Sequence, residues 1–222
     1  MLSSWSASNM WCVGMVSAVT ELFPPGPVAA GLRIGLLGGS FNPAHAGHVH
    51  ITEVGLRRLG LDYVWWLVTP QNPLKDVRGM APLAQRLADA RALWSHPRVV
   101  ISDLERRLGT DYTVDTLRRL QQRFVGVHFV WLMGSDNLEQ FHRWRDWQTI
   151  MHLLPVAVII RPGSSLAGLR ARAGQRFVRS RVFATGGFAL RRPPALIVLD
   201  GPRHPLSAST IRARRLVAAC PS

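Results

Sequence analysis

The sequence is poor in cysteine and almost free of lysine. Its two cysteines, Cys12 and Cys220, stand near opposite ends of the 222 residues and outside any CxxC or Cys/His spacing. This excludes a disulfide framework and a structural zinc site built on cysteine, and it favours a reducing cytoplasm as the location. Lys75 is the one lysine among 27 basic residues. At this position the chain keeps a compact ammonium on a flexible stem, whereas arginine offers a planar fork.

The first 32 residues contain no lysine or arginine and a single acid, Glu21. A secretory signal peptide needs a basic region before its apolar run, and a membrane span needs about 20 uninterrupted apolar residues. Neither pattern is present, because the apolar clusters are short and FPPGP interrupts them at residues 23–27. We therefore expect residues 1–32 to form a poorly ordered N-terminal extension, or to result from an upstream translation start, and we expect no membrane segment.

Acidic residues are nearly missing from the last third of the chain. The net charge is +14, and residues 151–222 hold twelve arginines against a single acid, Asp200. Such a surplus favours polyanionic ligands, which include nucleotide phosphates, nucleic acid and anionic membranes. A solvated arginine-rich surface explains most of these residues equally well, so the charge alone does not choose a ligand.

Short apolar runs that alternate with helical patterns are abundant. A chain of 222 residues, 47% of them hydrophobic, can bury the core of one domain. Strands are expected at residues 33–38, 63–69, 98–102, 127–134, 153–160 and 195–200. Helices are expected at residues 46–59, 81–95, 113–124 (with Thr113 as N-cap), 164–183 and 207–219. This order predicts an α/β fold, a Rossmann-like doubly wound parallel sheet with a small C-terminal helical part.

The stretch GGSFNPAHAGH, residues 38–48, follows the first expected strand. In a doubly wound sheet, ligands bind beyond the C-terminal ends of the strands. Gly38 and Gly39 would let the backbone approach a ligand, although an ordinary tight turn also uses glycine. His45 and His48 are three residues apart at a helix start, so both imidazoles can face one phosphate near the helix amides. We expect a phosphate site here, and we expect His50 to point elsewhere on the helix.

The segment GLLGGSFNPAHAGH resembles the GxFDPxHxGH signature of the nucleotidyltransferases related to class I aminoacyl-tRNA synthetases. Further motifs occur in the order seen in bacterial nicotinate-nucleotide adenylyltransferases: TPQNPLK (69–75), DYTVDTL (111–117), GSDNLEQFHRW (134–144), RPG (161–163) and SASTIR (207–212). The resemblance runs from about Arg33 to Arg215. It implies that residues 33–222 form one nucleotidyltransferase domain.

That family transfers AMP from ATP to nicotinate mononucleotide in NAD biosynthesis and forms deamido-NAD and pyrophosphate. By resemblance, the catalytic residues are His45, His48, Lys75 and Arg212. The ATP-binding residues are Gly38, Gly39, Ser40, Phe41, His45, His48, Ser209, Thr210 and Arg212. The acceptor-binding residues are Lys75, Tyr112, Thr113, Asp136 and Trp144. The family implies Mg²⁺ that is carried by ATP, with no metal ligands from the protein.

Three of these positions keep an alternative. Trp144 would stack on the pyridine ring of the acceptor, but it can instead pack in the core, as we expect for Trp65, Trp66 and Trp131 in strands. Asp136 can instead be a helix N-cap. Asn42 stands where the family often has aspartate, and we interpret it as a turn residue, for which the two are near equivalents.

Other functions remain open at this stage. The same fold could use another acceptor, such as nicotinamide mononucleotide or phosphopantetheine, or it could transfer a cytidylyl group. A nucleic-acid-binding protein would use the arginines between Arg161 and Arg215, but no nucleic-acid-binding module is recognisable and the histidine pair would have no role. We therefore expect ATP and nicotinate mononucleotide as partners and no nucleic acid. A homo-oligomer is compatible with the sequence.

Overall fold

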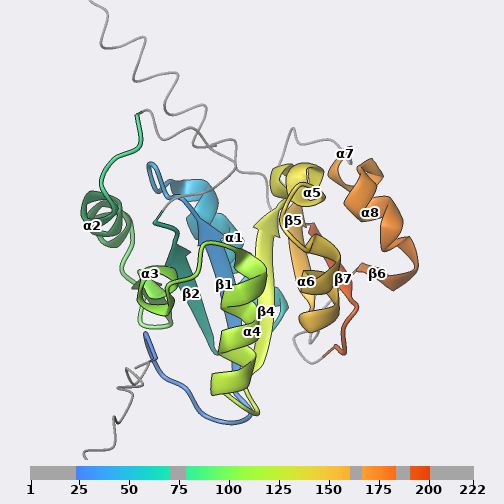
Figure 1. Cartoon of the computed structure of the whole chain (residues 1–222), viewed down its shortest axis with the longest axis horizontal. Helices are drawn as coiled ribbons and strands as arrows, with labels where there is room; N and C mark the ends of the chain where they lie inside the picture. The colour runs from blue at the N-terminus through green and yellow to red at the C-terminus, as the bar shows by residue number, and fades with distance from the viewer. Residues whose placement is uncertain (1–23, 71–78, 161–166, 184–190, 201–222) are drawn as a thin grey trace, which may run out of the picture.

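A computed structural model describes residues 24–70, 79–160, 167–183 and 191–200 of the chain. They build a seven-stranded sheet with the strand order β3-β2-β1-β4-β5-β7-β6, in which every neighbouring pair is parallel (Figure 1). The strands are β1 (Arg33–Gly39), β2 (Tyr63–Val68), β3 (Val99–Ser102), β4 (His128–Gly134), β5 (Val156–Ile160), β6 (Arg181–Phe183) and β7 (Leu196–Asp200). The order reverses between β1 and β4, which is the place where a doubly wound sheet binds its ligand.

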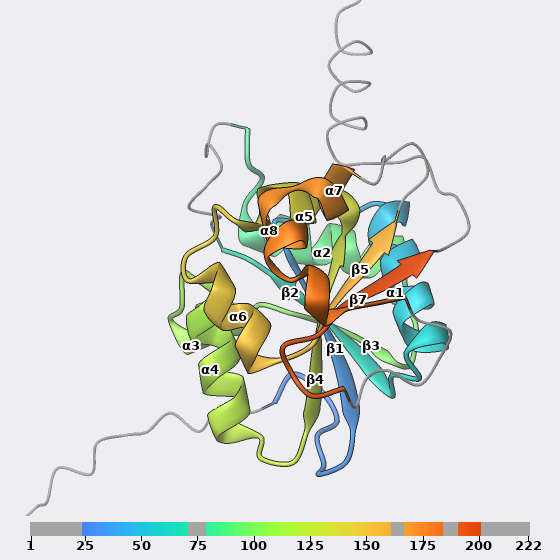
Figure 2. The ribbon, with the colours of Figure 1, turned by 90° about the vertical axis from the view of Figure 1, so that its right-hand side faces the viewer.

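Helices cover both faces of this sheet. They are α1 (Ala46–Arg58), α2 (Leu83–Leu93), α3 (Leu104–Leu108), α4 (Thr113–Arg123), α5 (Ser135–Phe141), α6 (Trp147–Leu153), α7 (Ala167–Arg170) and α8 (Arg172–Arg176). In Figure 2, α1 lies to the right of the sheet, whereas α3, α4 and α6 lie to its left. The fold class expected from the sequence is confirmed.

The two cores follow from the alternation of side chains along each strand. Trp65 and Leu67 of β2 point into the core under α3 to α8, whereas Val64, Trp66 and Val68 point into the core under α1 and α2. Because both faces are covered, the strands are apolar throughout rather than alternating. The assignment of Trp65, Trp66 and Trp131 to buried strands is confirmed.

The segment 164–183 differs from its prediction as one arginine-rich helix. Its described part forms the short helices α7 and α8, a 3-10 turn at Val178–Ser180 and the edge strand β6. Ala171 has an extended backbone and separates α7 from α8. A Cβ on Gly174 would lie 2.4 Å from the Leu169 carbonyl oxygen, so only glycine permits the tight return of the chain. The arginine spacing predicted one continuous helix, but the backbone forms several short elements instead.

Thr113 is not an N-cap as expected. It is the first residue of α4, and Tyr112 occupies the N-cap position without a side-chain hydrogen bond to the helix. The expected helix at 207–219 and most of the expected extension, residues 1–23, lie outside the described residues. Residues 24–32 are described, and Val28 and Leu32 pack against the core under α3 to α8. No helix in the described ranges is long and apolar enough to cross a membrane.

Candidate active site

The loop between β1 and α1 lies at the C-terminal edge of the sheet, beside the strand-order reversal. We call residues 38–48 the phosphate loop, after its predicted role. The Thr69 N–H, just after β2, donates a 2.9 Å hydrogen bond to the Gly39 carbonyl, which continues the sheet into this loop. The first turn of α1 contains no acidic side chain, so the positive end of its helix dipole faces an incoming anion without internal compensation.

His45 and His48 cap this helix reciprocally. His45 is the N-cap residue, and its Nδ1 accepts a 3.0 Å hydrogen bond from the Gly47 N–H. The His45 N–H in turn donates to Nδ1 of His48 at 3.2 Å. The ring centroids are 4.0 Å apart, as the three-residue spacing predicts. Because each Nδ1 accepts a hydrogen bond, the neutral form of each ring carries its N–H proton on Nε2.

Phe41 supports His48 from within the core. Its ring is 1% exposed and stacks on His48 at 4.4 Å and on Trp66 at 5.1 Å between ring centroids. Its backbone has φ 46°, in the left-handed region that costs a non-glycine residue about 1–3 kcal/mol. The chain accepts this strain beside a predicted binding site. Any contact of Phe41 with a nucleotide would come from its backbone, because its ring is covered.

The two glycines of the loop are explained by different surroundings. A Cβ on Gly38 would lie 2.4 Å from the ring of Trp131, so this glycine is required by core packing. A Cβ on Gly39 would meet the Phe41 ring at 3.6 Å, which is an ordinary contact. Core packing is therefore sufficient to explain glycine at position 38. Packing does not require glycine at position 39, so the expected close approach to a ligand remains the explanation there.

Asn42 connects the phosphate loop to the start of α2. Its Nδ2 donates to the Gly79 carbonyl at 3.1 Å, and its Oδ1 accepts from the Ala81 N–H at 3.3 Å. An aspartate could accept the second bond but could not donate the first. Asparagine and aspartate are therefore not equivalent at this position, because only the amide can donate the hydrogen bond to Gly79.

Arg86 of α2 is a buried residue that the sequence analysis did not single out. Its side chain is 2% exposed and donates four hydrogen bonds, all to backbone carbonyls. Burial lowers the pKa of Arg86 from its ordinary value. Arg86 and Ala90 are the buried positions of α2, and the sequence did not indicate this because arginine is ordinarily exposed.

Two of the residues expected to bind the acceptor, Tyr112 and Thr113, lie at the start of α4, and Trp144 lies between α5 and α6. The guanidinium of Arg145 lies 4.6 Å from the ring centre of Tyr112, and the neighbouring Trp144 is half-buried. Trp144 contacts Trp131 and Phe141 edge to face, at 5.9 and 5.3 Å between centroids. It packs on the core with one edge and keeps part of its surface exposed. Arg145 had not been predicted, although it directly follows the FHRW motif.

Trp131 connects the two groups of residues. One end of its ring lies against Gly38 of the phosphate loop, and Trp144 packs against the same side chain. Asp136 lies in the first turn of α5, whose N-cap is Gly134, so the alternative role of Asp136 as an N-cap is wrong. Lys75, Ser209, Thr210 and Arg212 lie outside the described residues.

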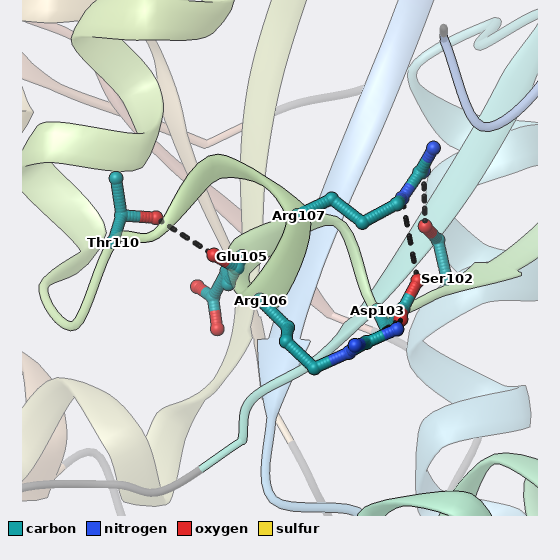
Figure 3. Close-up of polar contacts among 6 residues, drawn as sticks. All are labelled: Ser102, Asp103, Glu105, Arg106, Arg107 and Thr110. Atoms are coloured by element: carbon teal, nitrogen blue, oxygen red, sulfur yellow. Dashed lines mark hydrogen bonds and ion pairs between the residues drawn. The ribbon is translucent and has the colours of Figure 1, made fainter. Parts of the chain in front are cut away.

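Glu105 of α3 is a second buried polar residue that was not predicted. It is 4% exposed, and its backbone carbonyl accepts from the Thr110 N–H at 3.0 Å. Burial raises the pKa of the Glu105 carboxyl to about 7, and a hydrogen bond with the Thr69 side chain lowers it by less. Figure 3 shows that Arg106 and Arg107 turn toward Asp103 and Ser102 instead, so they do not neutralise Glu105.

Comparison with known proteins gives one consistent result. A family model described as cytidylyltransferase-like matches residues 36–214. A protein of Methylorubrum extorquens named "Probable nicotinate-nucleotide adenylyltransferase" is 52% identical over 185 residues, which cover 82% of this chain and all of the relative. A protein of Cereibacter sphaeroides with the same name is 55% identical over 180 residues, 81% of this chain and 96% of the relative.

A solved structure supports the fold. The nicotinic acid mononucleotide adenylyltransferase of Plasmodium falciparum, complexed with NaAD, superposes with a TM-score of 0.61. The match covers 82% of this chain and 83% of that chain at 15% sequence identity. At this identity the likeness concerns the arrangement of helices and strands.

Proposed function

The chain belongs to the nicotinate-nucleotide adenylyltransferases of the cytidylyltransferase-like family, and we propose on this premise how its residues divide the reaction. As a nucleotidyltransferase of this family, it transfers the adenylyl group of ATP to nicotinate mononucleotide and makes deamido-NAD. The 5′-phosphate oxygen of the acceptor attacks the α-phosphorus of ATP, and the bond to the departing pyrophosphate breaks. Such a transfer needs no covalent intermediate, so positioning and charge stabilisation supply the catalysis.

The single observation that supports the phosphate assignment is the reciprocal capping of His45 and His48. Both Nδ1 atoms accept hydrogen bonds from the backbone, so a phosphate oxygen would be bound through Nε2–H of each ring. The stack on Phe41 and Trp66 holds the His48 ring in place. Two oriented N–H donors at a helix N-terminus would stabilise the negative charge that grows on the transferred and departing phosphates.

Further phosphate contacts come from the family motifs alone. Lys75 and Arg212 would add cationic contacts, and Ser209 and Thr210 would offer hydroxyl groups at a helix start. Mg²⁺ would arrive bound to the ATP phosphates and neutralise part of their charge. The described part of the chain contains no group of three or more His, Cys, Asp or Glu side chains that could hold a metal.

On the acceptor side we assign nicotinate mononucleotide to Tyr112, Thr113, Asp136 and Trp144, with the exposed part of Trp144 beside the pyridine ring. The geometry adds Arg145, which stacks on Tyr112 next to Trp144. A guanidinium there would attract the ring carboxylate of nicotinate more than the neutral amide of nicotinamide. A cytoplasmic location and the assembly state stay predictions from the sequence.

The direct test follows a label through the reaction. ATP labelled at the α-phosphate is incubated with Mg²⁺, nicotinate mononucleotide and the full chain, and the products are separated. Adenylyl transfer places the label in the dinucleotide, whereas hydrolysis to ADP and phosphate leaves it in ADP. A His45→Gln, His48→Gln double variant is the matched control, and it should lose the labelled dinucleotide. Label that appears only in ADP, or equally in both proteins' dinucleotide, would contradict the proposal.

A further inference from the structure

Arg86 is a buried arginine whose hydrogen bonds in the described part of the chain all go to carbonyl oxygens. Its Nη1 donates to Ser40 at 2.6 Å and to Thr69 at 2.7 Å, its Nη2 to Pro70 at 2.8 Å, and its Nε to Ala81 at 2.8 Å. A buried cation is ordinarily paired with a carboxylate, because desolvation of an unpaired charge is costly. Here backbone dipoles take that place.

The four carbonyls belong to three separate segments. Ser40 lies in the phosphate loop, Thr69 and Pro70 follow β2, and Ala81 precedes α2. One rigid fork therefore joins the ends of two neighbouring strands to the start of a helix. Asn42 makes a second link between the phosphate loop and the start of α2, through Gly79 and Ala81.

The fork also orients a backbone group of the loop. In a trans peptide, the carbonyl of one residue and the N–H of the next point in opposite directions. Because the Ser40 carbonyl is held against Arg86, the Phe41 N–H points away from the guanidinium. No carboxylate of the described residues pairs with Arg86, and its charge adds to the positive potential behind a loop that we assign to phosphate.

We propose that Arg86 is a positioning residue for adenylyl transfer: it holds the phosphate loop and the end of β2 in the one arrangement in which both meet the same triphosphate. The inference rests on the proposed function of that loop. Arg86 acts through the backbone of Ser40, Thr69 and Pro70 and does not itself touch the nucleotide. A lysine would keep the charge but would lose the planar fork that reaches three segments together.

The test measures kcat and the KM of each substrate in Arg86→Lys and Arg86→Gln. Arg181→Lys is the matched control, because Arg181 also donates to two carbonyls, those of Leu169 and Gly174, from the edge strand β6, which three other strands separate from β1. We expect Arg86→Lys to lower kcat about tenfold or more and to raise the KM for ATP, as a displaced binding loop does. The KM for nicotinate mononucleotide should stay near the wild-type value, and Arg181→Lys should keep all three constants.

The variants must be compared below their own melting temperatures. If Arg86→Lys melts early but keeps wild-type constants while folded, Arg86 is structural only and the proposal is overturned. Equal increases in both KM values would also overturn it, because they would indicate general loosening. If neither Arg86 variant folds, Asn42→Ala decides, since it breaks the second link at a more exposed position. An unchanged KM for ATP in Asn42→Ala would then refute the proposal, and an increase of severalfold would support it.

The outcome for Arg86 is separable from that of the proposed function. A wild-type protein that fails to make the labelled dinucleotide contradicts the function itself. An active wild type with unaffected Arg86 variants contradicts only the positioning role.

Discussion

The proposed phosphate side and the proposed acceptor side of the site are built by different kinds of interaction. His45 is 4% exposed, and directional hydrogen bonds fix its ring and the backbone around it. Trp144 is half-buried, and Arg145 is exposed and touches Tyr112 through a ring contact. Hydrogen bonds to buried groups permit few alternative geometries, whereas ring contacts permit small shifts. We infer that the phosphate side is preorganised for the reacting centre and that the acceptor side adapts to its substrate.

The largest effect is expected for His48→Ala. This variant removes one charge-stabilising donor, and it should lower kcat about a hundredfold to a thousandfold with little change in the KM of the acceptor. Steady-state pyrophosphate release measures both constants. His128→Ala is the control and should retain wild-type rates, because His128 is exposed at the N-terminal end of β4, away from the phosphate loop. Near-normal turnover of His48→Ala would remove the phosphate assignment.

The next effect concerns Glu105, which forms a hydrogen bond with the Thr69 side chain just after β2. Its pKa is about 7 in the folded protein against an ordinary value of 4.5, so the folded state keeps a proton that the unfolded chain releases between these values. The stabilisation by this proton is complete below about pH 4.5. It is lost as the pH rises through the pKa of about 7, a change of about 3 kcal/mol.

Glu105→Gln should remove this part of the pH dependence. Urea unfolding between pH 5 and pH 8 should show a steeper fall of the unfolding free energy in the wild type than in the variant. Glu139→Gln, at an exposed position of α5, should keep the wild-type slope. Parallel curves for wild type and Glu105→Gln would show that the carboxyl ionises normally in the folded state.

A smaller effect is expected for Trp144→Ala. Loss of one stacking face should raise the KM for nicotinate mononucleotide about tenfold and leave kcat nearly intact. Trp147→Ala is the matched control, because Trp147 also packs edge to face on Phe141, at 6.0 Å between centroids. It should lower the melting temperature without changing this KM. If both variants lose only stability, Trp144 is a core residue and the contrast between the two sides fails.

The smallest effect is expected for Arg145→Gln. Without the guanidinium, the preference for nicotinate over nicotinamide mononucleotide, measured as a ratio of kcat/KM values, should fall about fivefold, the size of one exposed charge contact. Arg143→Gln tests whether any nearby positive charge has the same effect, since Arg143 is also exposed. Equal ratios in wild type and Arg145→Gln would assign the preference to other groups.

The sheet was predictable from local signals except for the edge strand β6, which lies in a segment predicted as helix. Apolar runs that end in Gly or Pro gave the strands, and the spacing of His45 and His48 gave their proximity. The roles of Arg86 and Asn42 were not predictable, because their partners are backbone groups from distant parts of the chain. The pattern of side chains in a sequence does not indicate which backbone carbonyls point into the core. The extended Ala171 escaped prediction for a similar reason, since alanine favours helix and only the tertiary packing of α7 and α8 decides otherwise.

The most direct measurement of the central claim is pyrophosphate release by the full chain with ATP and Mg²⁺, offered nicotinate mononucleotide, nicotinamide mononucleotide and phosphopantetheine in separate reactions. We predict rapid release with nicotinate mononucleotide, slower release with nicotinamide mononucleotide and none with phosphopantetheine. Release with phosphopantetheine alone would keep the chemistry of the histidine pair but contradict the acceptor site built on Tyr112, Trp144 and Arg145. Absence of release with all three would contradict the account as a whole.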